Sequence, residues 1–222
     1  MNFAEVITED LFLNEAASNS LLLLDLDDTL LTAQNVFVYR TKEHPSGAAK
    51  LTPQQYAKEK VTASTKGFYD YKDFRTAETV GNSIITGIPI ISNLKMMDSY
   101  IKNGWKIGIL TARGMENVVF KSIKVFLKFK EAGELKDIGD KLVRELVFAI
   151  NDDNKKYKGN TDFTRKKNVM LSLLDKYDRV WLLDDDLKNI KAINDLKTEL
   201  KNKKDIRHGK LRAIFAKKKQ EI

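Results

Sequence analysis

Three aspartates stand directly after a run of four leucines, in the segment LLLLDLDDTL (residues 21–30). Asp25, Asp27 and Asp28 are close enough for their negative charges to repel one another and to raise each other's pKa, unless a cation or a proton lies among them. A buried hydrophobic strand needs no such cluster at its end. The segment is therefore either an unusually acidic turn or a strand that delivers carboxylates to a site.

Polar side chains also follow two other apolar runs of the chain. In order along the sequence, the side chains behind the three runs are Asp25, Asp27, Asp28 and Thr29; Thr111 and Arg113; and Asp184, Asp185, Asp186 and Asn189. Ligands of open α/β sheets bind beyond the carboxyl ends of the strands. Three such strand ends are much less probable by chance than one, so the pattern predicts a shared site.

The strands that must position these side chains are expected to be short, continuous apolar runs, as a sheet covered on both faces requires. Five are expected, over residues 21–25, 106–110, 146–150, 180–183 and 211–215, with amphipathic helices over 93–103, 116–131, 166–177 and 189–200. This alternation predicts an α/β fold with a doubly wound, mainly parallel five-stranded Rossmann-like sheet. We expect residues 1–222 to form a single domain.

Residues 31–92 interrupt the alternation after the first strand. Thr52 and Pro53 are typical of a helix N-cap and the first helical position. We expect an insert, or small cap, with a hairpin and a helix that covers the carboxyl edge of the sheet. Its aromatic segment GFYDYKDF (67–74) either packs as the insert's own core or stacks a base, and the former is favoured because aromatic side chains mostly pack.

The segments at the strand ends resemble the four motifs of the haloacid dehalogenase (HAD) superfamily. The first motif, an apolar strand followed by DxDxT, is matched at residues 25–29, and the second, an apolar strand ending in Ser or Thr, at residues 107–111. The third, a lysine, is matched by Lys166 or Lys167, which follow Arg165, and the fourth, an acidic pair followed by Asp or Asn, at 184–189. The layout is also similar to small members encoded by bacteriophages.

This resemblance implies a role for each matched residue. Asp25 would be the nucleophile that forms an aspartyl-phosphate, and Asp27 would protonate the leaving alcohol and later accept a proton from water. Thr111 would donate a hydrogen bond to a phosphoryl oxygen, and Lys166 would add a fixed positive charge. The implied ligands of a Mg²⁺ cofactor are Asp25, Asp27 through its backbone carbonyl, Asp185 and Asp184.

Several assignments leave alternatives open. Lys167 stands beside Lys166 and could reach the same site from the first turn of the expected helix. The spacing to Asn189 favours Asp185 over Asp184 as the direct metal ligand. The remaining polar residues have simpler interpretations, in which Asp28 and Thr29 cap a helix or turn, Arg113 binds substrate or lies on the surface, and His44 and His208 are neither ligands nor bases.

Charge and composition limit the classes of function. The chain has no cysteine, so it has neither disulfides nor thiolate chemistry, and a reducing compartment fits. The first twenty residues do not have the pattern of a signal peptide, and no apolar run is long enough to span a bilayer, which predicts a cytoplasmic protein.

The net charge is +8, and residues 197–222 hold ten Lys or Arg against three Asp or Glu, a local net of +7. This basic segment is either a solvated end or a contact for nucleic acid.

The acid at position 27 separates two kinds of chemistry within the superfamily. Dehalogenases lack an acid there, so Asp27 favours a Mg²⁺-dependent phosphomonoester hydrolase. The expected substrate is a nucleotide, a sugar phosphate or a phosphorylated nucleic-acid end, the last of which would suit the basic segment. The alternative is a non-catalytic nucleic-acid-binding protein on the same scaffold, although such a protein has no use for the set of Asp25, Asp27, Thr111 and Asp185.

Overall fold

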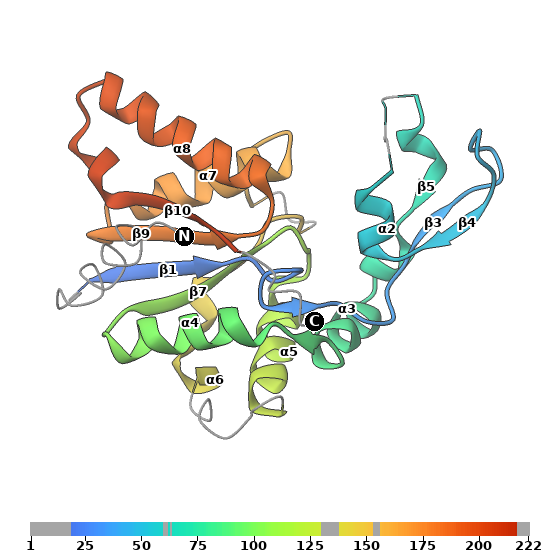
Figure 1. Cartoon of the computed structure of the whole chain (residues 1–222), viewed down its shortest axis with the longest axis horizontal. Coiled ribbons are helices and arrows are strands. Elements are labelled where there is room, and N and C mark those ends of the chain that lie inside the picture. Colours follow the sequence, from blue (N-terminus) through green and yellow to red (C-terminus); the bar gives the residue numbers. More distant parts are fainter. Residues whose placement is uncertain (1–18, 60–61, 63, 130–137, 153–155, 217–222) are drawn as a thin grey trace, which may run out of the picture.

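The computed structural model describes residues 19–59, 62, 64–129, 138–152 and 156–216. A five-stranded sheet lies at its centre, in the order β10-β9-β1-β7-β8, and all of its strands are parallel (Figure 1). These strands are β1 (Ser20–Leu24), β7 (Lys106–Thr111), β8 (Val147–Ala149), β9 (Arg179–Asp184) and β10 (Leu211–Phe215). The expected α/β fold with a mainly parallel, Rossmann-like sheet is confirmed.

The first strand lies at the middle of the sheet, and the chain winds outward from it in both directions. β7 and β8 extend the sheet on one side of β1, and β9 and β10 extend it on the other side. The carboxyl ends of β1, β7 and β9 are therefore neighbours. A crevice for a ligand forms at such a point, where the strand order reverses.

Helices cover both faces of the sheet. They are α4 (Ile91–Lys102), α5 (Glu116–Phe129), α6 (Ile138–Lys141), α7 (Asp162–Leu173) and α8 (Leu187–Asn202), with short 3-10 helices at Arg144–Leu146 (η3) and Ile206–Lys210 (η4). Because successive side chains of a strand point to opposite faces, Leu22 and Leu24 pack in the core on the side of α4 and α5. Leu21 and Leu23 pack in the second core, with α7 and α8, which accounts for the continuous leucine run.

The insert leaves the sheet through a two-stranded neck and forms a small subdomain, drawn at the right of Figure 1. Its neck pairs β2 (Leu31–Thr32) with β6 (Ile88–Pro89), and its own sheet has the order β4-β3-β5. The remaining elements are β3 (Val38–Arg40), β4 (Ala49–Leu51), β5 (Tyr69–Asp70), α2 (Pro53–Ala57), α3 (Ala77–Ile85), η1 (Lys66–Phe68) and η2 (Lys72–Phe74). The expected hairpin is β3–β4, and the expected helix is α2, which Thr52 caps in a capping box.

Two of the differences between the expected elements and the structure concern helices beside the site. The helix predicted to begin at residue 166 begins at Asp162, because Thr161 is its N-cap and accepts a hydrogen bond from the backbone of Thr164. Helix α3 was not predicted. Its sequence signal is the N-cap Thr76 with the buried Val80 and Ile84 at helical spacing.

The described basic residues of the C-terminal segment that precede β10 lie toward the amino edge of the sheet. Helix α8 begins directly after β9 and runs back over its 16 residues, about 24 Å, so Lys201 and the basic residues of η4 lie beyond the amino edge. Lys217–Lys219 and most of the acidic N-terminus lie outside the described residues. Within the described part of the chain, none of the helices has the length and apolar character to cross a membrane.

Candidate active site

Three sequence-predicted side chains meet at the carboxyl edge of the sheet. Asp25 directly follows β1, and its backbone N–H donates to Leu183 O of β9 at 2.9 Å. Thr111 ends β7 and Asp184 ends β9, on either side of β1. Asp25, Thr111 and Asp184 are all buried, so whatever they contact is largely shielded from water.

Lys166 links the first and last of these strand ends. Its Nζ lies 3.0 Å from Asp25 Oδ1 and 2.7 Å from Asp184 Oδ2, and its side chain is 1% exposed. Burial alone would lower the pKa of Lys166, but the two carboxylates outweigh it and raise the pKa, so the ammonium group stays charged. Lys167 points to the opposite side of α7, toward Glu199. Of the two candidate lysines, the structure brings Lys166 to the site.

The two carboxylates of the acidic pair have different surroundings. Asp184 accepts hydrogen bonds from Lys166, from the side chain of Asn189 at both oxygens, and from the backbone of Asp186. These contacts occupy the roughly four lone-pair positions of a carboxylate. Asp185 accepts the Thr29 hydroxyl at 3.1 Å through Oδ1. Burial, followed by the charge of Asp184, raises the pKa of Asp185 to about 6.

Asp25, Asp184 and Asp185 form a cluster that one lysine does not neutralise. One carboxylate oxygen of each residue lies within 4.8 Å of one oxygen of each of the other two. Asp25 Oδ1 is buried and receives no well-aligned hydrogen bond from the described residues, although Lys166 is near it. Burial raises the pKa of Asp25 to about 8, because the attraction of Lys166 only partly offsets burial and the nearby Asp184 and Asp27. Hard oxygen donors with excess negative charge fit a Mg²⁺ ion.

Asp27 turns away from this cluster and pairs with Arg113. The guanidinium donates to both Asp27 oxygens at 2.7 and 2.8 Å. Arg113 also donates to Val80 O at 3.2 Å and Ser83 Oγ at 2.7 Å, both in α3 of the insert. The Arg113 side chain is 3% exposed, so its expected alternative as a surface residue is wrong. This contact couples Asp27 to the insert and was not predicted, because residues 27 and 113 are far apart in the sequence.

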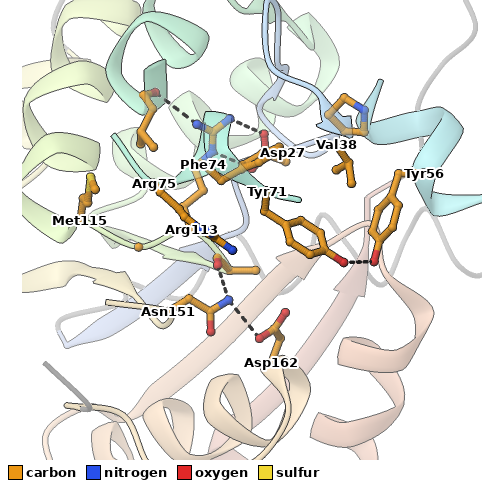
Figure 2. Close-up of a pocket in the computed structure, with 14 residues that line it drawn as sticks. Asp27, Val38, Tyr56, Tyr71, Phe74, Arg75, Arg113, Met115, Asn151 and Asp162 are labelled. Carbon is orange, nitrogen blue, oxygen red and sulfur yellow. Dashed lines mark hydrogen bonds and ion pairs between the residues drawn. The ribbon is translucent and has the colours of Figure 1, made fainter. Parts of the chain in front are cut away.

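A cavity of about 760 Å³ lies beside Asp27, between the sheet and the insert (Figure 2). From the insert, Tyr56, Tyr71 and Phe74 line it, and Arg113 and Asn151 line it from loops that follow the sheet strands. The aromatic segment 67–74 is thus divided. Tyr69 is buried in the insert's core with Val38 and Leu51, as predicted, whereas Tyr71 and Phe74 also face the cavity.

The other polar residues singled out in the sequence lie outside the carboxylate cluster or support it. Thr29 is not a cap but a donor to Asp185, and Asp28 lies in a turn with φ 57°. His44 is buried in the insert, 3.1 Å from the Tyr69 hydroxyl, and His208 lies in η4. Both histidines are therefore remote from the cluster.

Comparison of the chain with protein-family models, with curated proteins and with solved structures finds no match. The site is therefore interpreted from its own geometry.

Proposed function

We propose that this chain is a Mg²⁺-dependent phosphomonoester hydrolase of the HAD type, which works through an aspartyl-phosphate on Asp25. One observation carries the proposal: Lys166 lies between Asp25 and Asp184 at the carboxyl edge of the sheet, with Asp185 and Thr111 beside them. Phosphoryl transfer requires a positioned nucleophile and fixed positive charge around the equatorial oxygens. This arrangement supplies the nucleophile and one of the charges.

The proposed reaction has two displacements at phosphorus. A carboxylate oxygen of Asp25 attacks the phosphorus atom, the bond to the leaving oxygen breaks, and Asp27 gives that oxygen a proton. Water then attacks the phosphorus atom of the aspartyl-phosphate and gives a proton to Asp27, and the bond to Asp25 breaks. The products are an alcohol and phosphate, and both aspartates return to their starting state.

The residues around the phosphoryl group divide the remaining work. Thr111 Oγ1 accepts the backbone N–H of Arg113 at 3.3 Å, which leaves its own proton for a phosphoryl oxygen. Lys166 holds positive charge there, and Asp184, fully engaged by its own donors, keeps Lys166 in position. Arg113 holds the Asp27 carboxyl through both oxygens in this structure, so Asp27 must release one of these hydrogen bonds to carry the proton that it transfers.

The donor set suits a cation held by Asp25 and Asp185, with the backbone carbonyl of Asp27 as a further ligand. Asp185 is favoured over Asp184 because its described hydrogen bonds leave an oxygen available. When bound, Mg²⁺ would neutralise the carboxylates and the charge of the phosphoryl oxygens.

A screen of phosphomonoesters with Mg²⁺ tests the proposal. The wild type should release phosphate from at least one class of ester, EDTA should stop it, and Asp25→Asn should lower kcat by at least about 10³-fold, as loss of a covalent nucleophile does. Asp195→Asn is the matched control, since this carboxylate pairs with Lys191 on the surface. Hydrolysis by pure Asp25→Asn at the wild-type rate would rule out the nucleophile, and no hydrolysis of any ester by the wild type would rule out the function.

The alternative of a nucleic-acid-binding protein has less support. The described basic residues between Lys201 and Lys210 lie at the edge of the sheet opposite to the carboxylates. Basic residues at that edge do not by themselves hold a substrate at the carboxylates.

A further inference from the structure

The cavity between the insert and the sheet lies on the side of the site where a leaving group would be. Asp27 is the proposed proton donor to the leaving oxygen, and its partly exposed side chain lines this cavity. Asp25, the proposed nucleophile, is not part of the lining. In the proposed reaction, the cavity would therefore receive the alcohol portion of the ester, and the phosphoryl group would lie at Asp25.

The wall that the insert contributes is aromatic and held in place. The hydroxyls of Tyr56 and Tyr71 are 2.6 Å apart, and their rings meet edge to face with centroids 5.7 Å apart (Figure 2). Tyr56 also packs edge to face on the buried Tyr69, with centroids 5.2 Å apart. Phe74, another lining residue, packs against the same small core. Rings fixed in this way need little further ordering when a flat ligand binds.

The polar groups of the lining mostly bind one another. Arg113 and Asp27 form a bidentate pair, and Asn151 Nδ2 donates to Ala112 O at 2.6 Å and to Asp162 Oδ1 at 3.1 Å. A simple sugar, which needs many hydrogen bonds, would find few groups to satisfy it. Asp162 is half exposed and can still accept a hydroxyl or amino proton.

We infer that this cavity binds the nucleoside of a nucleoside monophosphate, with the base against Tyr71, Phe74 and Tyr56 and the ester oxygen at Asp27; the inference rests on the proposed phosphatase function. Its volume of about 760 Å³ lies in the range of small-ligand sites, roughly 300–1,000 Å³. An aromatic wall attracts any base through its π face. Apart from Arg113, which is engaged by Asp27, the only cation among the lining residues that the structure describes is Arg75, so a single nucleotide fits better than a polyanionic strand.

The test compares kcat/KM with Mg²⁺ for nucleoside 5′- and 3′-monophosphates, ribose 5-phosphate, O-phosphotyrosine and a 3′-phosphorylated oligonucleotide. A nucleoside monophosphate should exceed each of the others by about 10-fold or more, the gain expected of one base–aromatic stack. Tyr71→Leu should remove most of that advantage, lowering the nucleotide value more than that for ribose 5-phosphate. Tyr71→Phe keeps the ring and should retain the advantage. The remote control is Tyr177→Leu. It removes a partly exposed tyrosine whose ring centroid lies 5.2 Å from Nζ of Lys106, the first residue of β7, and it should leave kcat/KM for every substrate unchanged.

Several results would overturn the inference. One is a kcat/KM for ribose 5-phosphate or O-phosphotyrosine equal to that for the nucleoside monophosphates. Another is a 10-fold preference for the oligonucleotide over the nucleoside monophosphates. The last is an equal loss of kcat/KM for the nucleotide and for ribose 5-phosphate in Tyr71→Leu. If no ester is hydrolysed, the phosphatase proposal is wrong, and saturation-transfer NMR with adenosine and cytidine decides the cavity separately. Transfer to the nucleoside that Tyr71→Leu weakens and Tyr177→Leu retains would then support a nucleoside site, and no transfer would exclude it.

Discussion

The substitution Asp25→Asn should stabilise the metal-free protein at neutral and alkaline pH, although it removes the proposed nucleophile. Burial and neighbouring carboxylates raise the pKa of Asp25 from 3.8 to about 8. The folded chain therefore binds this proton more tightly than the unfolded chain, so the stabilising contribution is complete below about pH 3.8 and is lost as the pH rises through about 8. At pH 7, which is about three pH units above 3.8, the wild type has lost about 4 kcal/mol of this stabilising contribution, at about 1.4 kcal/mol per unit. Asparagine carries no charge and avoids this cost.

Thermal melts in EDTA between pH 5 and pH 9 measure the effect. At pH 7 the variant should melt about 8–16 °C above the wild type, since about 1 kcal/mol corresponds to about 2–4 °C in a chain of this size. The difference should shrink toward pH 5, and Mg²⁺ should raise the melting temperature of the wild type more than that of the variant. Asp195→Asn removes an exposed carboxylate and should show no such pH dependence. Parallel pH curves, or a variant less stable at pH 8, would show that Lys166 alone balances the cluster and would refute the reasoning.

Three further substitutions test the scaffold. Gly108→Ala should lower the free energy of unfolding in urea by about 1–3 kcal/mol, because a Cβ there would lie 2.5 Å from the carbonyl oxygen of Leu146 in the neighbouring segment. An unchanged free energy of unfolding would mean that the backbone at Leu146 shifts at little cost. Arg113→Lys should lose one charge-assisted hydrogen bond to Asp27, which corresponds to about 1.5–3 kcal/mol of stability. It should also lower kcat more than it raises KM, and an unchanged kcat would show that proton transfer by Asp27 does not depend on Arg113. Thr52→Ala should cost about 1 kcal/mol through loss of the α2 cap, with no effect on ester hydrolysis, and a change in kcat would indicate that α2 orders the site.

Local chemistry in the sequence determined the strands and part of the insert. A strand buried on both faces must be apolar along its whole length, so the runs at 21–24 and 180–183 could be recognised directly. The polar residues behind them had to lie at one edge because parallel strands share their carboxyl ends. Thr52 and Pro53 predicted the start of α2 because capping depends on residues within one turn. The acidic cluster at Asp25 followed from the same reasoning.

Only the tertiary structure decided which neighbour of each pair faces the site. Successive residues of a helix point about 100° apart, so the start of α7 at Asp162 decides that Lys166 turns inward and Lys167 outward. Asp184 and Asp185 differ because the donors around Asp184 come from two separate helices. The pairing of Asp27 with Arg113, like the cavity beside it, joins segments far apart in the chain, and sequence spacing carries no information on contacts that only packing creates.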